Sequence, residues 1–180
     1  RSRLFNDCSS LSTLYFNADS CTNSSTVFYE SNLTSLSIGE NVKHIPSGIF
    51  SGCSSLTGTL TIPDSVIVIG DNAFSGCTSL TGTLTIPNSV IVIGDFAFWD
   101  CTGFSGTLFI PESVTTIGRV AFGNCSDLTE LILGNNVDSI GYSAFSNCTG
   151  LSSITSYNEI PPVFVGLNYG HPFYNVNRNT

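Results

Sequence analysis

The sequence is poor in charged residues, which make up 10% of its 180 residues, against roughly 25% in ordinary soluble domains. Serine, threonine, asparagine and glycine take their place. The formal net charge is −8, and Lys and Arg together number 5. These few cations are scattered between Arg1 and Arg178 and form no basic stripe. Because binding to a phosphate backbone needs such a stripe, we exclude nucleic acid as a partner.

Long apolar runs are also missing. No segment approaches the roughly 20 apolar residues of a membrane-spanning helix, although an apolar content of 41% is enough to bury a core. The first residues, Arg1 to Phe5, are charged and do not resemble a signal peptide. We therefore expect a mature or trimmed chain, in which a missing signal says nothing about export.

The cysteines do not suggest a disulfide framework. Their number, 7, is odd, and five of them recur at nearly constant intervals: Cys53, Cys77, Cys101, Cys125 and Cys148. Such regular intervals indicate a repeat. Metal sites need clustered ligands, so we expect no metal, no cofactor and a ladder of buried, reduced thiols. Cys21 is out of phase, and its pairing with Cys8 is left open.

Alignment on these cysteines gives a unit of roughly 22–24 residues that recurs about seven times. The regular units cover residues 38–155, a degenerate part covers 1–37, and an irregular last unit covers 156–180. We therefore predict a single repeat domain over residues 1–180.

The two ends of the array depart from the repeat pattern. In the degenerate unit 16–37, Val27 and Glu30 align with the Phe and Cys of the regular units. In the last unit, Phe173 and Val176 take these positions after a longer insertion.

The unit 62–85, IPDSVIVIGDNAFSGCTSLTGTLT, predicts how one coil folds. Its inward positions are Ile62, Val66, Ile69, Ala73, Phe74, Cys77, Leu80 and Leu84. One coil cannot bury all of these side chains, so each coil needs neighbours on both sides. Leu84 and Ile86 alternate with threonines such as Thr85, the pattern of a half-buried strand, and Pro87 ends that strand because it lacks an N–H.

These features predict a right-handed solenoid with a parallel β-sheet on one face. The other side is expected to consist of turns, 3₁₀ segments and a second narrow row of strands. The stretch 71–76 has turn residues around a buried Phe. Glycine recurs at one place in the unit, where we expect a turn with positive φ: Gly70, Gly94, Gly118 and Gly141.

The recurring pattern IPxSVxxIGxxAFxxCxxLxxxL resembles the BspA-like leucine-rich repeats, also called the Treponema type, over roughly residues 5–155. Members of that family are mostly exported to the surface of Gram-negative anaerobes of the gut or mouth. Some adhere to host matrix proteins or to other cells, and the family shares no catalytic residue. The resemblance implies an extracellular, surface-displayed leucine-rich repeat scaffold that binds a host matrix protein or a glycan. Solenoid ends need covering, so we expect the natural protein to continue beyond Thr180.

Outward strand positions are the informative ones for binding. They form two rows, Tyr15, Ser37, Thr61, Thr85, Phe109, Ile132 and Thr155, and Thr13, Ser35, Thr59, Thr83, Thr107, Glu130 and Ser153. Phe109 and Ile132 interrupt the hydroxyl row on adjacent coils. They are either ordinary exposed apolar residues or contacts for a partner, with Glu130 supplying a polar contact at the rim.

Trp99, the single tryptophan, stands where Ser75 and Gly123 stand in sister units. We expect it on the convex side, where it either packs against a flanking turn or anchors an interface. The candidate ligand-binding residues are therefore Tyr15, Phe109, Glu130, Ile132 and Trp99.

Catalytic chemistry has little support in the sequence. His44 and His171 are the only histidines, and no motif places a base beside a Ser or Cys nucleophile. Asp71 and Asp95 repeat but are not followed by further acids, so we interpret them as turn residues and not as a calcium ladder. We expect a binding scaffold and not an enzyme. The alternatives are a spacer that displays another domain and a non-catalytic part of a larger secreted enzyme.

Overall fold

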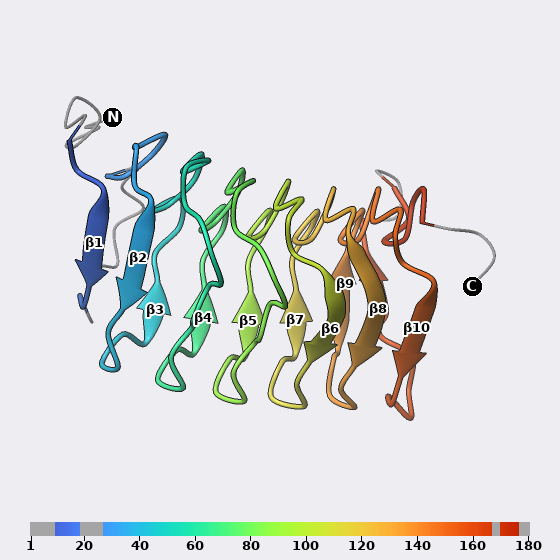
Figure 1. The fold of residues 1–180 in the computed structure, drawn as a ribbon. Coiled ribbons are helices and arrows are strands. Elements are labelled where there is room, and N and C mark those ends of the chain that lie inside the picture. The colour runs from blue at the N-terminus through green and yellow to red at the C-terminus, as the bar shows by residue number, and fades with distance from the viewer. Residues whose placement is uncertain (1–9, 19–26, 167–169, 177–180) are drawn as a thin grey trace.

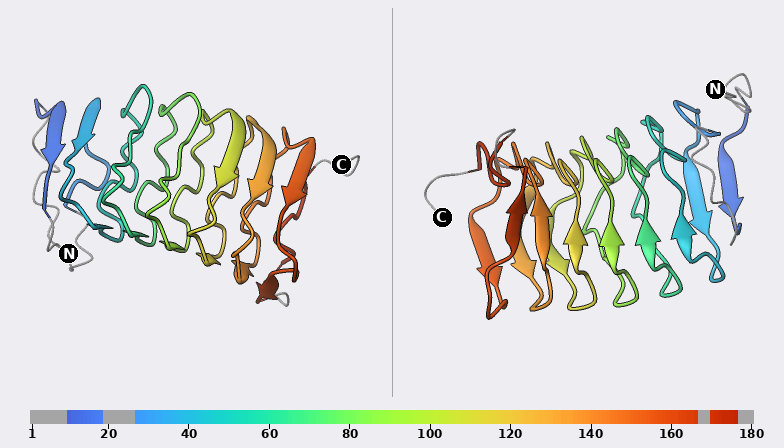
Figure 2. Two further views of the ribbon diagram at one scale, coloured as in Figure 1. Left: turned by 90° about the horizontal axis from the view of Figure 1, so that it is seen from below. Right: turned by 180° about the vertical axis from the view of Figure 1, so that it is seen from behind.

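The computed structural model of the chain describes residues 10–18, 27–166 and 170–176. These residues wind into a flattened parallel β-solenoid whose coils stack side by side (Figure 1). Each coil crosses two opposite faces, which Figure 1 shows from the front and the right panel of Figure 2 from behind. Turns join the faces along an upper and a lower edge. The predicted solenoid is confirmed. None of the described segments forms a helix that is long and apolar enough to cross a bilayer.

The face at the rear of Figure 1, here called the narrow face, carries the continuous sheet of the described chain. Its order is β11-β9-β7-β5-β4-β3. The strands are β3 (His44–Ile45), β4 (Val68–Ile69), β5 (Val92–Ile93), β7 (Thr116–Ile117), β9 (Ser139–Gly141) and β11 (Val163–Val165). Ile45, Ile69 and Ile93 lie in register and point into the core. The narrow second row of strands expected from the sequence thus forms the sheet with the most strands in the described chain.

The front face, here called the broad face, has longer strands. β1 (Thr13–Phe16) pairs with β2 (Ser35–Ile38), and β6 (Gly106–Ile110), β8 (Leu128–Leu133) and β10 (Ser153–Ser156) form a second sheet. The predicted parallel sheet is therefore present on this face. In the coils between these two groups, the described residues are joined by isolated bridges, including Gly58 to Leu80 and Gly82 to Phe104.

One extra residue per coil explains this thinning of the sheet. The unit 110–132 is one residue shorter than the units 62–85 and 86–109. The longer units carry a glycine in the strand, and Gly82 and Gly106 have φ of 82° and 79°. A left-handed residue bends the backbone out of the extended path. The register between β6 and β8 accordingly shifts directly after Gly106.

A column of phenylalanines fills the centre of the stack. Phe50, Phe74, Phe98, Phe122 and Phe145 are fully buried. Successive ring centroids lie 5.4, 5.5, 5.3 and 5.3 Å apart, with the rings close to parallel. These distances are within the range of favourable aromatic pairs. The column therefore couples each coil to both of its neighbours.

The same column corrects the alignment of the N-terminal coil. Phe28, and not Val27, stacks on Phe50 at 6.0 Å, and the Oγ atom of Ser31, and not Glu30, lies 3.4 Å from the Sγ atom of Cys53. The alignment that placed Val27 and Glu30 at these positions is wrong by one residue. The reason is that this coil is shorter than the regular ones, so Phe28 and Phe50 are closer in sequence than Phe50 and Phe74.

At the other end the predicted alignment is confirmed. Phe173 stacks on Phe145 at 5.4 Å, and Val176 is buried where the other coils have cysteine. The expectation for Cys8 and Cys21 concerns positions outside the described residues.

The ladder cysteines are buried and unpaired. The backbone oxygen of Phe50 accepts the N–H of Cys53 in its own coil at 3.2 Å and the thiol of Cys77 in the next coil at 3.2 Å. Cys101, Cys125 and Cys148 donate in the same way at 3.1–3.3 Å. Each buried carbonyl thus accepts one backbone N–H and one thiol. Without the thiol, its second lone pair would lack a partner.

Burial raises the pKa of these thiols above the ordinary value of 9.0, and that of Cys148 to about 12. The reactive thiolate is therefore suppressed in the native state. The pKa of these thiols is higher in the folded protein than in the unfolded chain. Their contribution to the free energy of unfolding is therefore fully present below about pH 9. It is lost as the pH rises from there toward the folded values.

We expect the five ladder thiols to resist iodoacetamide at neutral pH in the native protein and to react fully in denaturant. The reason is that the reagent needs both access and a thiolate, and the fold provides neither. Mass spectrometry of labelled peptides measures this, with Cys8 and Cys21 counted separately. Two or more disulfides among the five, or labelling before unfolding, would contradict the buried ladder.

The upper edge consists of successive tight turns with two left-handed positions per coil. One lies two residues before the buried Phe and includes Asn72, Phe96 and Val120, with φ of 52–56°. The other directly precedes the ladder cysteine and includes Gly76 and Asp100, with φ of 74° and 61°. These left-handed residues separate the turns, which is why no helix forms along this edge of the described chain.

The repeated glycines do not have the expected positive φ, so that prediction is wrong. They are needed because adjacent coils approach very closely at this point. A Cβ atom on Gly94 would lie 2.6 Å from the backbone nitrogen of Asp71, and one on Gly118 would lie 2.5 Å from that of Asp95. Glycine is required here because a neighbouring backbone occupies the space of a side chain, and not because of its dihedral angles.

Candidate binding surfaces

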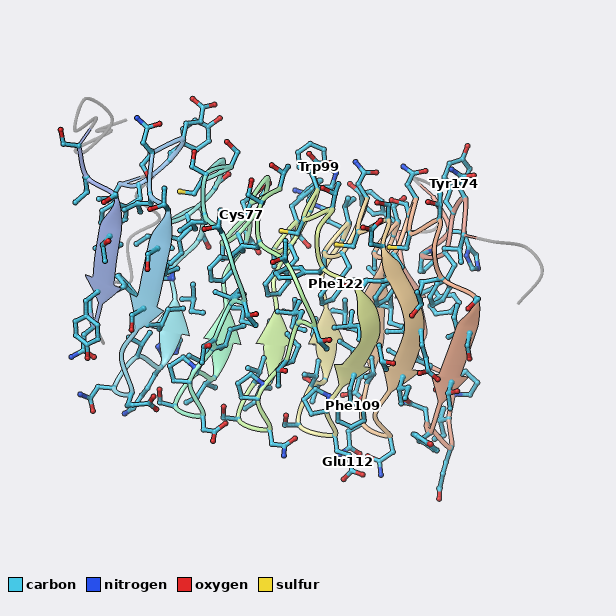
Figure 3. The ribbon with its side chains drawn as sticks, viewed as in Figure 1. Cys77, Trp99, Phe109, Glu112, Phe122 and Tyr174 are labelled. Atoms are coloured by element: carbon cyan, nitrogen blue, oxygen red, sulfur yellow. The ribbon has the colours of Figure 1, made fainter. Side chains whose placement is uncertain are left out.

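The structure brings Phe109 and Ile132 together on the broad face. They lie in register on β6 and β8, and Thr85 and Thr155 flank them in the same row. Phe109 is 45% exposed, whereas Ile132 is only half-buried. The outward orientation predicted from the alternation is therefore observed, but Ile132 offers less surface to solvent than the pattern alone suggested. Figure 3 shows Phe109 near the lower edge, close to Glu112.

Glu130 lies in the second row of the same sheet, in register with Thr107 and Ser153. Its Oε2 atom accepts a hydrogen bond of 2.8 Å from the hydroxyl of Thr107. One carboxylate oxygen is thus held by the neighbouring coil. This contact fixes the orientation of the acid beside the Phe109–Ile132 pair.

Tyr15 belongs to the same outward row but lies far from this pair. It is paired with Ser37 at the start of the array and is 65% exposed. The coils that contain Thr61 and Thr85 separate it from Phe109. The structure therefore does not join Tyr15 to the other candidates.

Trp99 is on neither face. It lies on the upper edge (Figure 3), so the expectation of a convex-side position is corrected. Its side chain is 37% exposed, and its Cδ1 atom would be 3.2 Å from a Cβ atom built on Gly123. The indole lies against the turn of the next coil and also exposes surface to solvent, so a role as an interface anchor stays a prediction.

Sequence reasoning missed that Trp99 is one of a row of aromatic residues. The corrected alignment puts Tyr29 and Tyr174 at the position of Trp99, two residues before the Cys-equivalent position of their coils. We call this the edge row: Tyr29, Ser51, Ser75, Trp99, Gly123, Ser146 and Tyr174. The carbonyls of Trp99 and Tyr174 accept equivalent hydrogen bonds from the preceding coil, at 2.7 and 2.9 Å. The alignment error of one residue at Glu30 placed Phe28, and not Tyr29, in this row.

An open hollow of about 460 Å³ lies between the first two aromatic residues of the edge row. Tyr29, Phe96 and Trp99 form its apolar lining, and Gly52 and Gly76 lie between the coils there. We call this the edge groove. Its size is within the usual range for small-ligand sites.

The charged group beside the edge groove is already paired. The Nε atom of Arg119 lies 2.8 Å from a carboxylate oxygen of Asp95, and the guanidinium covers the ring of Phe96 at 5.3 Å. A hydrogen bond with Tyr142, followed by the charge of Asp95, raises the pKa of Arg119. The cation is therefore held in place as part of the wall.

The acidic residues of the turns have structural roles. A carboxylate oxygen of Asp71 accepts the N–H of Asp95 at 2.9 Å, and Asp95 accepts that of Arg119 at 2.8 Å. These bonds support the interpretation of Asp71 and Asp95 as turn residues. Within the described ranges, no three carboxylate, thiol or imidazole groups converge on a possible metal position.

The two histidines lie at different ends of the array. His44 is exposed on β3, and His171 contacts Phe164 and Phe173 in the last coil. Exposed apolar side chains also gather at that end, including Ile160 and Val163. They lie where the described coils stop, so their exposure is not by itself evidence of a ligand site.

Comparison with known proteins gives a consistent assignment. The family model described as "BspA type Leucine rich repeat region" matches residues 1–59 and 57–163 in 6 copies. A leucine-rich repeat protein from T. pallidum has a similar structure, with a TM-score of 0.71 and 27% identity over 87% of this chain and 68% of that chain. One from Bacteroides ovatus has a TM-score of 0.55 and 26% identity, over 82% and 46% of the two chains. No curated protein matches the chain.

Proposed function

Because this chain belongs to the BspA-type leucine-rich repeat family, we propose that it is a cell-surface scaffold that binds a macromolecule through its broad face. The partner we favour is a host extracellular-matrix protein. The extracellular location is supported by the family resemblance and by the low content of charged residues, which are replaced by Ser, Thr and Asn.

The observation that carries this proposal is the pairing of Phe109 with Ile132. The same position holds Ser37, Thr61 and Thr85 in other coils, so neither the strand nor the core needs an apolar side chain there. Phe109 nevertheless exposes 45% of its surface beside Ile132. An aromatic residue beside an aliphatic one, with an oriented acid at the rim, has the composition of a protein-interface centre.

We expect the double variant Phe109→Ser, Ile132→Thr to keep its fold and to bind a matrix protein about tenfold more weakly. The magnitude follows from the loss of one interface anchor worth more than about 1.4 kcal/mol. Purified fibronectin, fibrinogen, laminin and collagen are immobilised, and the affinity of the unmodified protein for each is measured first. The double variant is then compared on those that bind, together with its melting curve.

The matched control is Tyr15→Ser, which removes an exposed aromatic residue from the same row but far from the pair. A double variant that binds at full strength would move the site off the broad face. Absence of binding to the whole panel would favour the alternatives, a structural spacer or a non-catalytic part of a larger secreted enzyme. Binding of a glycan, and of no matrix protein, that is lost in the double variant would replace the protein partner with a carbohydrate.

A further inference from the structure

The edge row places aromatic residues at a regular interval along the upper edge. Tyr29, Trp99 and Tyr174 are separated by two coils with small residues, first Ser51 and Ser75 and then Gly123 and Ser146. With a coil rise of about 4.8 Å, successive aromatic residues lie roughly 14 Å apart. Figure 3 shows Trp99 and Tyr174 on the same edge, and Tyr174 is 64% exposed.

The edge groove exists because two coils lack side chains at one position. Directly before the cysteine position, the later coils carry a connected series of polar side chains. The amide of Asn124 donates to Asp100 at 3.3 Å, and Asn147 donates to Asn124 at 2.9 Å. Gly52 and Gly76 interrupt this series. The hollow therefore lies next to Trp99 on the side where the polar ladder ends.

The aromatic wall of the groove carries a conformational cost. Phe96 has φ of 56°, at a position where the preceding coils have Gly48 and Asn72. Left-handed geometry is unfavourable for a bulky residue and routine for glycine or asparagine. Phe96 is not needed for the fold, because Asn72 and Gly48 support the same turn. Val120 has the same geometry and does not line the groove, so the aromatic ring of Phe96, and not the strain of the turn, distinguishes this site.

The polar groups in the groove suit a neutral, hydroxyl-rich ligand. Arg119 is the cation of the lining, and Asp95 already balances it. Ser51 and Asn72 contribute neutral side chains that donate and accept hydrogen bonds.

Peptide backbones have little to pair with in the groove. Its own backbone N–H groups are used between coils, as in Gly52 to the carbonyl of Ser75 at 2.7 Å and Gly76 to that of Trp99 at 2.7 Å. Addition of a peptide strand is therefore disfavoured.

We infer that the edge groove binds a neutral, linear oligosaccharide. Its sugar rings stack their C–H faces on Tyr29 and Trp99, and its hydroxyl groups bond Ser51 and Asn72. A polymer of identical sugars matches a row that repeats at constant spacing, and Tyr174 extends the same row beyond the groove. This site lies on a different surface from the Phe109–Ile132 pair and stands whether or not that pair binds a protein.

The test uses the single tryptophan as the probe. Cellohexaose, mannohexaose, xylohexaose and maltohexaose are titrated into the protein while its fluorescence is recorded, and calorimetry gives each affinity. We expect a saturable fluorescence change with at least one of them. Trp99→Ser and Tyr29→Ser should each weaken that binding about tenfold, the loss of one stacking contact. Serine stands at the same position in neighbouring coils, so both variants should fold.

Tyr15→Ser and the double variant of Phe109 and Ile132 are the controls, and both should bind the sugar with unchanged affinity. The proposal is overturned if none of the four hexasaccharides binds at millimolar concentration. It is also overturned if binding survives in both Trp99→Ser and Tyr29→Ser. A fluorescence change with a lysine-rich peptide and none with the sugars would assign the groove to a basic segment instead.

Discussion

Replacing Phe98 with alanine is expected to lower the free energy of unfolding by about 3–5 kcal/mol. Phe98 is fully buried, and its ring lies between those of Phe74 and Phe122 at 5.5 and 5.3 Å. Its edge also contacts Phe104, with the centroids 6.1 Å apart. The substitution would leave a cavity in the middle of the column, where the flanking coils cannot close it without losing their own contacts.

The loss should spread beyond one coil. Stability in a repeat array is a sum of coil terms and nearest-neighbour terms, and Phe98 contributes to both interfaces of its coil. Urea unfolding gives the free energy, and hydrogen exchange should show faster opening of the coils on either side. Phe109→Ala is the control, because the same residue type is removed from the surface. An unchanged melting temperature for Phe98→Ala would show that the column is not core.

Gly118→Ala should be almost as damaging although it adds one methyl group. The new Cβ atom would lie 2.5 Å from both the nitrogen of Asp95 and the carbonyl carbon of Gly94. Relief of that contact requires the two coils to separate. Separation strains the hydrogen bond from the N–H of Gly118 to the carbonyl of Ile93, now 2.8 Å. We expect a loss of about 3 kcal/mol, the upper end for overpacked sites.

Gly58→Ala is the matched control for this prediction. Gly58 has φ of 79°, and a Cβ atom there would meet nothing within 4 Å. Its replacement costs only the left-handed conformation, about 1–2 kcal/mol. Urea unfolding of the two variants separates close approach from dihedral preference. A loss at Gly118 no larger than that at Gly58 would contradict the close approach of the two coils at Gly118.

The inward residues of the solenoid were predictable because they recur in phase. Ile-Pro, Ile-Gly, Ala-Phe and Cys return in register from coil to coil, and Leu84 and Ile86 point inward as their alternation indicates. The sequence did not reveal how strongly each face would pair. Pairing on the broad face depends on the left-handed turn at Gly82 and Gly106, which changes direction without changing the hydrophobic pattern.

Of the two candidate sites, one could be predicted from the sequence and the other could not. The outward direction of Phe109 follows from alternation along a strand and was predictable. The edge groove was not, because turns have no period from which to read direction. Its aromatic wall depends on the left-handed conformation of Phe96, and its first residue, Tyr29, was misaligned in a coil shorter than the regular ones. An alignment that allows coils of unequal length and tracks aromatic residues two positions before the cysteine would have found it.

The hydrogen bonds between coils have a mechanical consequence. Bonds such as that of Gly76 to Trp99 join one coil to the next, so they run along the axis of the stack. Tension applied at the two ends loads the bonds of one terminal coil first, and that coil peels away before the next is strained. Each coil, of about 24 residues, then adds about 80 Å of extended chain. Under a steady pull the array lengthens in steps and dissipates work at each step, while the coils that have not yet detached keep their shape.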